Sequence, residues 1–204
     1  TNIIHLVNNN KAKIINNVFY DIEFGHANAN LISAGGTRGP ATIISHNTFG
    51  TSSCPQLAKP NVVVDSQKSK FEYNIMNGYD TVNSFADIKD GEANYNLFYN
   101  LTGSSGNAPF GQSSGGPSGS SNNITGNSAN ALFRGPLSNT SDADYRLAGT
   151  NSPAFDAAVG SSDVTEDYTG FSRSILDKSA LATGIFDIGA YELTGLFSEE
   201  QADS

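Results

Sequence analysis

The hydrophobic positions of this chain fall in short runs that alternate with polar residues, and turn-forming residues separate the runs. In the first hundred residues, no segment keeps apolar residues at the i, i+3, i+4 and i+7 spacing of an amphipathic helix over several turns. Strand-like runs recur instead between Gly, Asn and Asp residues, at 12–20, 30–33, 41–49, 61–65, 71–76, 84–88 and 93–101. Short strands at this density predict an all-β fold.

Four of these runs repeat one pattern around an Asn. Asn17, Asn47, Asn74 and Asn96 each follow an apolar residue by three positions and precede a large apolar residue by two. Successive Asn residues of this set lie 30, 27 and 22 positions apart. Such spacings are typical of a solenoid in which each coil packs on the next. We interpret the four residues as a structural ladder that passes side-chain amide hydrogen bonds from coil to coil.

The repeat pattern stops near residue 102 and gives way to Gly, Ser, Pro and Asn. We therefore predict that residues 1–102 form about four solenoid coils and that residues 103–122 form a long Gly/Ser-rich loop. Residues 123–195 are predicted to close the same domain, and residues 196–204 form a tail.

The closing segment carries four motifs that resemble a known family. They read Asp144-Tyr145-Arg146-Leu147, Ser152-Pro153-Ala154-Phe155-Asp156-Ala157, Asp167-Tyr168-Thr169-Gly170-Phe171-Ser172-Arg173 and Asp187-Ile188-Gly189-Ala190-Tyr191-Glu192. This succession resembles the C-terminal end of secreted bacterial right-handed parallel β-helix proteins, the pectate-lyase-like superfamily. The resemblance implies a right-handed parallel β-helix and a secreted or cell-surface location. Its motifs are specific for the fold and weak for the reaction.

An end coil exposes an apolar cross-section and unpaired strand edges, which must be covered. We expect an ion-pair set to pin the closing segment across that end, formed by Asp167, Arg173, Asp187 and Glu192. The alternative is that these carboxylates bind a ligand. The side chains expected to cover the core are Leu147, Phe155, Ile188 and Tyr191. The first coil opens at Ile3 without an amphipathic cap, and we expect it to need a neighbour.

Counting back from the ladder aligns a pair of carboxylates. Asp65 and Asp87 each lie nine positions before their Asn, so they should stack on adjacent coils, where they repel each other unless a cation lies between them. By resemblance, polyuronide lyases of this fold hold Ca²⁺ with acidic residues and remove a proton with Lys or Arg. The candidates are Asp65 and Asp87 for Ca²⁺, with Lys68 and Lys89 as the base. The alternative is a solvated charged face.

The net charge and the composition limit the classes of molecule that this chain is expected to bind. The net charge of −9 and a pI near 4.6 disfavour nucleic acid and anionic membranes. No apolar run approaches the roughly 20 residues that span a bilayer. The lone Cys54 excludes an internal disulfide framework. Three N-x-S/T sequons, no more than chance predicts in so polar a chain, are candidate glycosylation sites at Asn100, Asn123 and Asn139.

The remaining residues with side chains suited to chemistry give weaker signals. Three residues without metal-ligand spacing are predicted to be surface or coil residues: His5, His26 and His46. A sugar-stacking strip could be formed by Tyr20, Tyr73, Tyr79, Tyr95 and Tyr99. The alternative is that Tyr73 and Tyr95, which repeat with the coil, pack on each other.

The sequence thus predicts an extracellular or cell-surface β-helix module associated with polysaccharide. It would bind the glycan and, if catalytic, cleave acidic glycans by a lyase reaction. The alternative is a structural subunit that stacks head to tail into an extracellular filament. Polysaccharide or further copies of the chain are the expected partners, without nucleic acid or membrane insertion.

Overall fold

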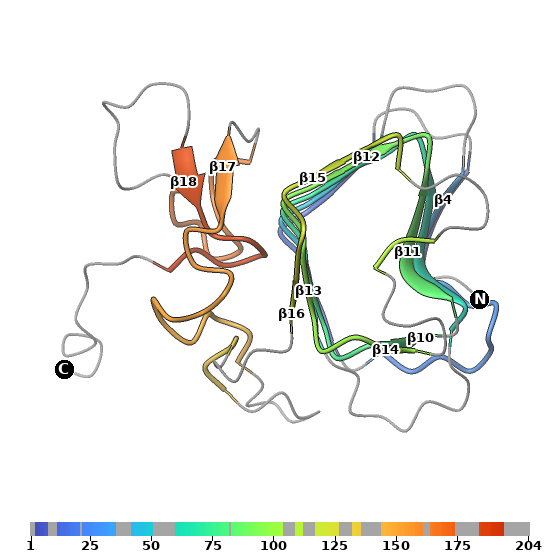
Figure 1. Ribbon diagram of the computed structural model, residues 1–204, viewed down its shortest axis with the longest axis horizontal. Coiled ribbons are helices and arrows are strands. Elements are labelled where there is room, and N and C mark those ends of the chain that lie inside the picture. Colours follow the sequence, from blue (N-terminus) through green and yellow to red (C-terminus); the bar gives the residue numbers. More distant parts are fainter. Residues whose placement is uncertain are drawn as a thin grey trace.

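Strands and turns, without a helix, make up the described part of the chain. The computed structural model describes residues 3–7, 12–20, 22–35, 42–50, 60–81, 83–103, 109–111, 117–126, 132–135, 144–160, 164–173 and 184–193. Between residues 4 and 126, consecutive strands belong to different sheets, and the neighbours within a sheet come from successive turns of the chain. These neighbours pair in parallel, so the chain is a parallel β-helix, seen nearly end-on in Figure 1. We call each turn of the helix a layer.

Three sheets surround the core. The first sheet contains, in spatial order, β1 (Ile4–Val7), β4 (Ile32–Gly35), β7 (Val62–Gln67) and β11 (Ser84–Lys89). The second contains β2 (Lys13–Ile15), β5 (Ile43–Ser45), β8 (Lys70–Glu72), β12 (Glu92–Asn94) and β15 (Gly119–Ser121). The third contains β3 (Val18–Phe19), β6 (Thr48–Phe49), β9 (Ile75–Asn77), β13 (Leu97–Tyr99) and β16 (Ile124–Gly126). A smaller sheet pairs β10 (Asp80–Thr81) with β14 (Thr102–Gly103).

A tight bend joins the second sheet to the third in every layer. The residue at the bend has a φ between 53° and 58° in Asn16, His46, Tyr73, Tyr95 and Asn122. This left-handed conformation is uncommon for residues other than Gly, Asn, Asp and His. The bend is stabilised by the Asn that follows it, because the backbone N–H and side-chain amide of that Asn bond to the next layer. Each bend therefore depends on the layers stacked beside it.

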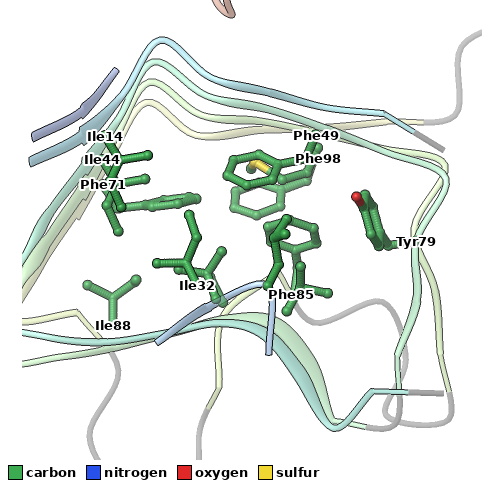
Figure 2. Close-up of a cluster of buried hydrophobic side chains, with 14 of the residues drawn as sticks. Ile14, Ile32, Ile44, Phe49, Phe71, Tyr79, Phe85, Ile88 and Phe98 are labelled. Carbon is green, nitrogen blue, oxygen red and sulfur yellow. The ribbon is translucent and has the colours of Figure 1, made fainter. Parts of the chain in front are cut away.

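Inward-facing side chains form rows along the axis. One row runs through the second sheet from Ile14 to Ile44, Phe71 and Ala93, and Figure 2 shows the first three of these in one column. A second row runs through the third sheet and contains Phe19, Phe49, Met76 and Phe98. Most of these side chains are fully buried in a single cluster, which is the core of the helix.

The helix continues past the predicted boundary at residue 102. Strands β15 and β16 extend the second and third sheets by one more layer, in register with β12 and β13. Their residues, 119–126, lie in the ranges assigned from sequence to the loop and the closing segment. The two inward rows end here in Ser120 and Thr125. The apolar pattern that marks the earlier coils is absent at these positions, which is why the sequence pattern ends sooner.

The C-terminal segment lies beside the helix, not across its end. Its strands β17 (Ala158–Gly160) and β18 (Gly184–Phe186) pair antiparallel, and Figure 1 shows them in orange and red next to the third sheet. A second buried cluster joins Leu147 and Ile188 of this segment to Ile75 and Leu97 on the outer face of that sheet. The expectation that these side chains close the end of the solenoid is therefore replaced by packing along its side.

Candidate functional site

Polar side chains gather on the outer face of the first sheet. Ser33, Asp65 and Asp87 are register partners on the neighbouring strands β4, β7 and β11. Gln67 and Lys89 are register partners two positions further along β7 and β11. Because side chains alternate between the faces of a strand, residues two positions apart lie on the same face. The solenoid thus arranges five polar groups on three stacked strands.

Four of these groups border a hollow of about 180 Å³, and Asp87 lies outside its lining. It is lined by Ser33, Ala34, Gly35, Asp65, Gln67 and Lys89. Gly35 has open space where a side chain would begin, so it leaves the end of β4 accessible. The lining offers a carboxylate, an amide, an ammonium group and a hydroxyl within one hollow. Such a set can donate and accept several hydrogen bonds at once.

The charges of the site are coupled. The Lys89 Nζ lies 3.8 Å from Asp87 Oδ2. Burial raises the pKa of the Asp65 carboxyl, the Lys89 ammonium opposes this rise, and the Asp87 carboxylate adds to it. Lys89 therefore supplies the cation that the stacked carboxylates require.

Asp87 lies deeper than Asp65, with only 8% of its surface exposed. The backbone of Gly111 passes over it, with Gly111 N–H donating to the Ala86 carbonyl at 2.8 Å. A Cβ atom at Gly111 would lie 3.2 Å from both the Asp87 Cγ and the Ser84 Oγ. Gly111 therefore allows the next segment to cover Asp87, and Asp65 remains the accessible carboxylate of the pair.

Three of the four candidates from sequence come together, and Lys68 does not join them. Lys68 is exposed, lies outside the lining of the hollow and has a φ of 51° at the turn after β7. Its backbone N–H donates to the Lys89 carbonyl at 2.7 Å. Gln67 was not among the candidates predicted from sequence. It nevertheless lies seven positions before Asn74, just as Lys89 lies seven positions before Asn96.

The donor set does not fit the predicted Ca²⁺. Calcium takes six to eight oxygen ligands, whereas the two carboxylates here face an ammonium group. Within the described ranges, no three His, Cys, Asp or Glu side chains gather where they could share a metal ion. No step of a lyase reaction is derived through Ca²⁺ at this site.

The Asn ladder runs along the bend between the second and third sheets. Asn17, Asn47, Asn74 and Asn96 each donate from the side-chain amide to the Oδ1 of the next Asn in the row, at 2.9–3.0 Å. The last acceptor is Asn123, one of the sequons. Its amide donates to the Ala93 carbonyl and to Ser120 Oγ, so hydrogen bonds already engage the nitrogen that a glycan would need. Asn100 is exposed, and Asn139 lies outside the described residues.

The ion-pair set predicted in the C-terminal segment is built around Arg173. This buried guanidinium pairs with Glu192 at 3.2 Å and donates to Asn16 Oδ1 at 2.9 Å, joining the segment to the first layer. The Asp167 and Asp187 carboxylates accept backbone N–H groups instead of binding the guanidinium directly. The four residues therefore fasten the segment against the side of the helix.

His46 takes the coil position of the two predicted alternatives: it is fully buried at the bend of its layer and lies between the helix and the C-terminal segment. Its ring contacts Phe186, with centroids 5.4 Å apart, and Ser45 Oγ lies 2.7 Å from its Nδ1. Burial and the nearby Arg173 lower the pKa of His46. The sugar-stacking strip does not form, because Tyr79 is buried and Tyr73 stacks on Tyr95 at 5.5 Å.

Comparison of the chain with protein-family models, curated proteins and solved structures finds no match in any of the three. In the described part of the chain there is also no helix with the length and apolar character needed to cross a membrane. Any inference about function must therefore come from the geometry of the β-helix surface.

Proposed function

We propose that this β-helix is an extracellular or cell-surface module that binds polysaccharide on the outer face of its first sheet. The observation that supports this most is the hollow formed by Asp65, Gln67 and Lys89 on adjacent strands. A parallel sheet repeats side-chain positions about every 4.8 Å across its strands. A row of such groups can hydrogen-bond successive hydroxyls of an extended glycan. The resemblance of the C-terminal motifs to pectate-lyase-like proteins agrees with a sugar ligand and with secretion.

The charge of the site favours an uncharged, hydroxyl-rich glycan. Two carboxylates and one ammonium group leave the site with excess negative charge when all three are ionised, and the chain as a whole carries −9. A polyuronide would meet repulsion from both. Carboxylate, ammonium and amide groups instead pair well with the alternating donors and acceptors of sugar hydroxyls. The proposal is therefore binding of a neutral polysaccharide, and it assigns no catalytic residue.

Isothermal titration calorimetry of the purified chain with neutral and with acidic polysaccharides tests the proposal, because it measures the dissociation constant for each ligand. Asp65→Asn and Lys89→Gln should each weaken binding of the neutral ligand about tenfold or more, because each removes charge-assisted hydrogen bonds. Lys70→Gln is the matched control. Lys70 also lies in a carboxylate pair, 3.7 Å from Glu92, but is half-exposed on the second sheet.

Equal losses in Lys70→Gln and Lys89→Gln would contradict the proposed site. Tight binding of polyuronides only in the presence of Ca²⁺ would contradict the proposed ligand class. Cleavage, read as ultraviolet absorbance of an unsaturated product, would add a reaction that this geometry does not supply.

A further inference from the structure

The hollow of the proposed glycan site has a gap in its wall at the end of β4. Burial alternates along this strand, so that Ser33 and Gly35 lie on its outer face and the residues before each of them face the core. Both outer residues line the hollow. Gln67 and Lys89 take the corresponding outer positions on β7 and β11, two places after the row that starts at Ser33. On β4 that position carries no side chain, because it is a glycine.

Two common reasons for a glycine do not apply to Gly35. Its φ lies outside the left-handed region that disfavours other residues. A Cβ atom at this position would meet no described atom within 4 Å, apart from its chain neighbours. Gly111 differs, because a Cβ atom there would lie 3.2 Å from the Asp87 Cγ. Since glycine also weakens a strand relative to alanine, the described fold does not account for Gly35.

The missing side chain opens the backbone of β4 to the hollow. Ala34 also lines the hollow although its side chain faces the core, so its contribution comes from the backbone. A glycine in a strand is typical of a place where a ligand approaches the backbone closely. The backbone from Ser33 to Gly35 is therefore a surface against which a bound group can lie, with Gln67 and Lys89 beside it on the neighbouring strands.

The size and the lining of the hollow limit what can enter it. Its volume of about 180 Å³ is below the roughly 300–1,000 Å³ of pockets that enclose drug-sized ligands, so it accommodates a single small unit. The lining contains no aromatic and no large aliphatic side chain. Asp65 accepts hydrogen bonds, Lys89 donates them, and Gln67 does both. An apolar group would remove these groups from water without offering hydrogen bonds in return, which costs free energy.

We propose that one sugar unit of the bound glycan enters this hollow and lies against the β4 backbone, and that Gly35 selects the unit by size. This inference rests on the proposed function and deepens it by naming a specificity-determining residue. The contribution of Gly35 is space, because a sugar unit can bring its hydroxyls to Asp65, Gln67 and Lys89 only where no side chain lies between. A larger residue at position 35 would occupy the volume that the unit needs.

Isothermal titration calorimetry with dextran, galactomannan and xyloglucan, all neutral polysaccharides, compares the intact chain with Gly35→Ala and Gly35→Leu. For the ligand that the unmodified chain binds, Gly35→Leu should raise the dissociation constant about tenfold or more, because its side chain fills the hollow. Gly35→Ala should raise it less, since a methyl group takes less of the space. The matched control is Gly126→Leu. Gly126 ends β16 on the third sheet, away from the hollow, and also has open space at its Cβ position.

Thermal melting tests the same inference without a ligand. Because the backbone and the surroundings of Gly35 suit alanine, Gly35→Ala should leave the melting temperature unchanged or raise it by roughly 1–4 °C. A clear fall in the melting temperature of this variant would show that the fold itself needs the glycine. That result would overturn the inference.

A graded loss of binding, larger in Gly35→Leu than in Gly35→Ala and absent in Gly126→Leu, would support the proposal. Unchanged binding in Gly35→Leu, or an equal loss in Gly126→Leu, would overturn it. The glycan site would then still stand if Asp65→Asn and Lys89→Gln weaken binding. If the unmodified chain binds none of the polysaccharides, the proposed function fails and this inference fails with it, so the two failures are distinguishable.

Discussion

At the first layer the inward rows end in Ile14 and Phe19, whereas at the last described layer the same rows end in Ser120 and Thr125. The backbone is the same at both places, since both layers pair in parallel with their neighbours. The first layer and the last described layer differ in the side chains at their inward positions. The last described layer thus carries hydroxyls at the inward positions and Ser120 where the earlier layers have the next ladder Asn.

The C-terminal segment, as far as the structure describes it, adds a third environment on the side of the helix. It packs along the third sheet, where Gly189 N–H donates to the Tyr73 carbonyl and Arg173 reaches Asn16. The segment thus spans several layers from the side and ties them together. The same repeat therefore occurs in three environments: an apolar first layer, a polar last described layer, and a side that the C-terminal segment covers.

The largest expected effect on stability comes from the inward row of the third sheet, when a substitution in its middle is compared with one in the last described layer. Phe49→Ala should lower the free energy of unfolding by about 3–5 kcal/mol, because it opens a cavity in a fully buried cluster. Thr125→Ala should change it by less than about 0.5 kcal/mol, since Thr125 is exposed. Urea denaturation measures both. A large loss in Thr125→Ala would mean that the last layer is buried by something else.

The ladder offers a second comparison. Asn74→Ala should cost about 2–4 kcal/mol, because it leaves the Asn47 amide and backbone N–H without their acceptor inside the core. Asn123→Ala should cost about 1–2 kcal/mol, because Asn123 is only partly buried and water can replace it as the acceptor of the Asn96 groups. Equal losses, measured by the same denaturation, would show that the ladder is uniform to its end.

The dependence of stability on pH tests the contact between the C-terminal segment and the side of the helix. Burial and then the Asp187 carboxylate raise the pKa of Glu192 to about 8, against the opposing effect of Arg173. The folded state then holds a proton that the unfolded state releases near pH 4.5, so the free energy of unfolding should fall as the pH rises toward 8. Asp187, whose pKa burial raises to about 6, acts in the same direction.

His46 acts at the acid side. Its pKa is lowered by burial and then by Arg173, so below about pH 6.5 the unfolded state takes up a proton that the folded state does not. The His46 contribution to stability should therefore fall as the pH drops below that value, opposite in sign to the contributions of Glu192 and Asp187. Glu192→Gln should flatten the alkaline limb, and His46→Asn, which suits the left-handed bend, should flatten the acid limb. Thermal melts across pH would contradict this if both variants kept the wild-type profile.

The sequence predicts the repeated part of the molecule well. The position of Asn17, Asn47, Asn74 and Asn96 determines the register, and counting back from them places Asp65 beside Asp87, as the structure has them. The additional layer at Asn123 could not be recognised in the same way. Its neighbours at the core positions are Ser120 and Thr125, so the apolar signature is missing where the layer faces water.

Long-range contacts explain the other differences. His46 is buried by Phe186, a residue 140 positions later in the chain, and no local sequence pattern predicts that contact. The C-terminal motifs predict that the segment covers apolar surface, but not which surface. That choice depends on the outer faces of Ile75 and Leu97 in the third sheet, which periodicity alone assigns to solvent.

Amide hydrogen exchange of the intact chain, read residue by residue, tests the central claim, that the last described layer differs from the inner layers in its side chains, most directly. The backbone N–H groups of Asn74 and Asn96 donate to the next Asn of the ladder at 3.0 and 2.9 Å and lie in buried layers. The residues of the last described layer, 119–126, are exposed or only partly buried. The account predicts exchange at least about tenfold slower at Asn74 and Asn96 than in residues 119–126. Equal protection of the inner and the last described layers would contradict the account.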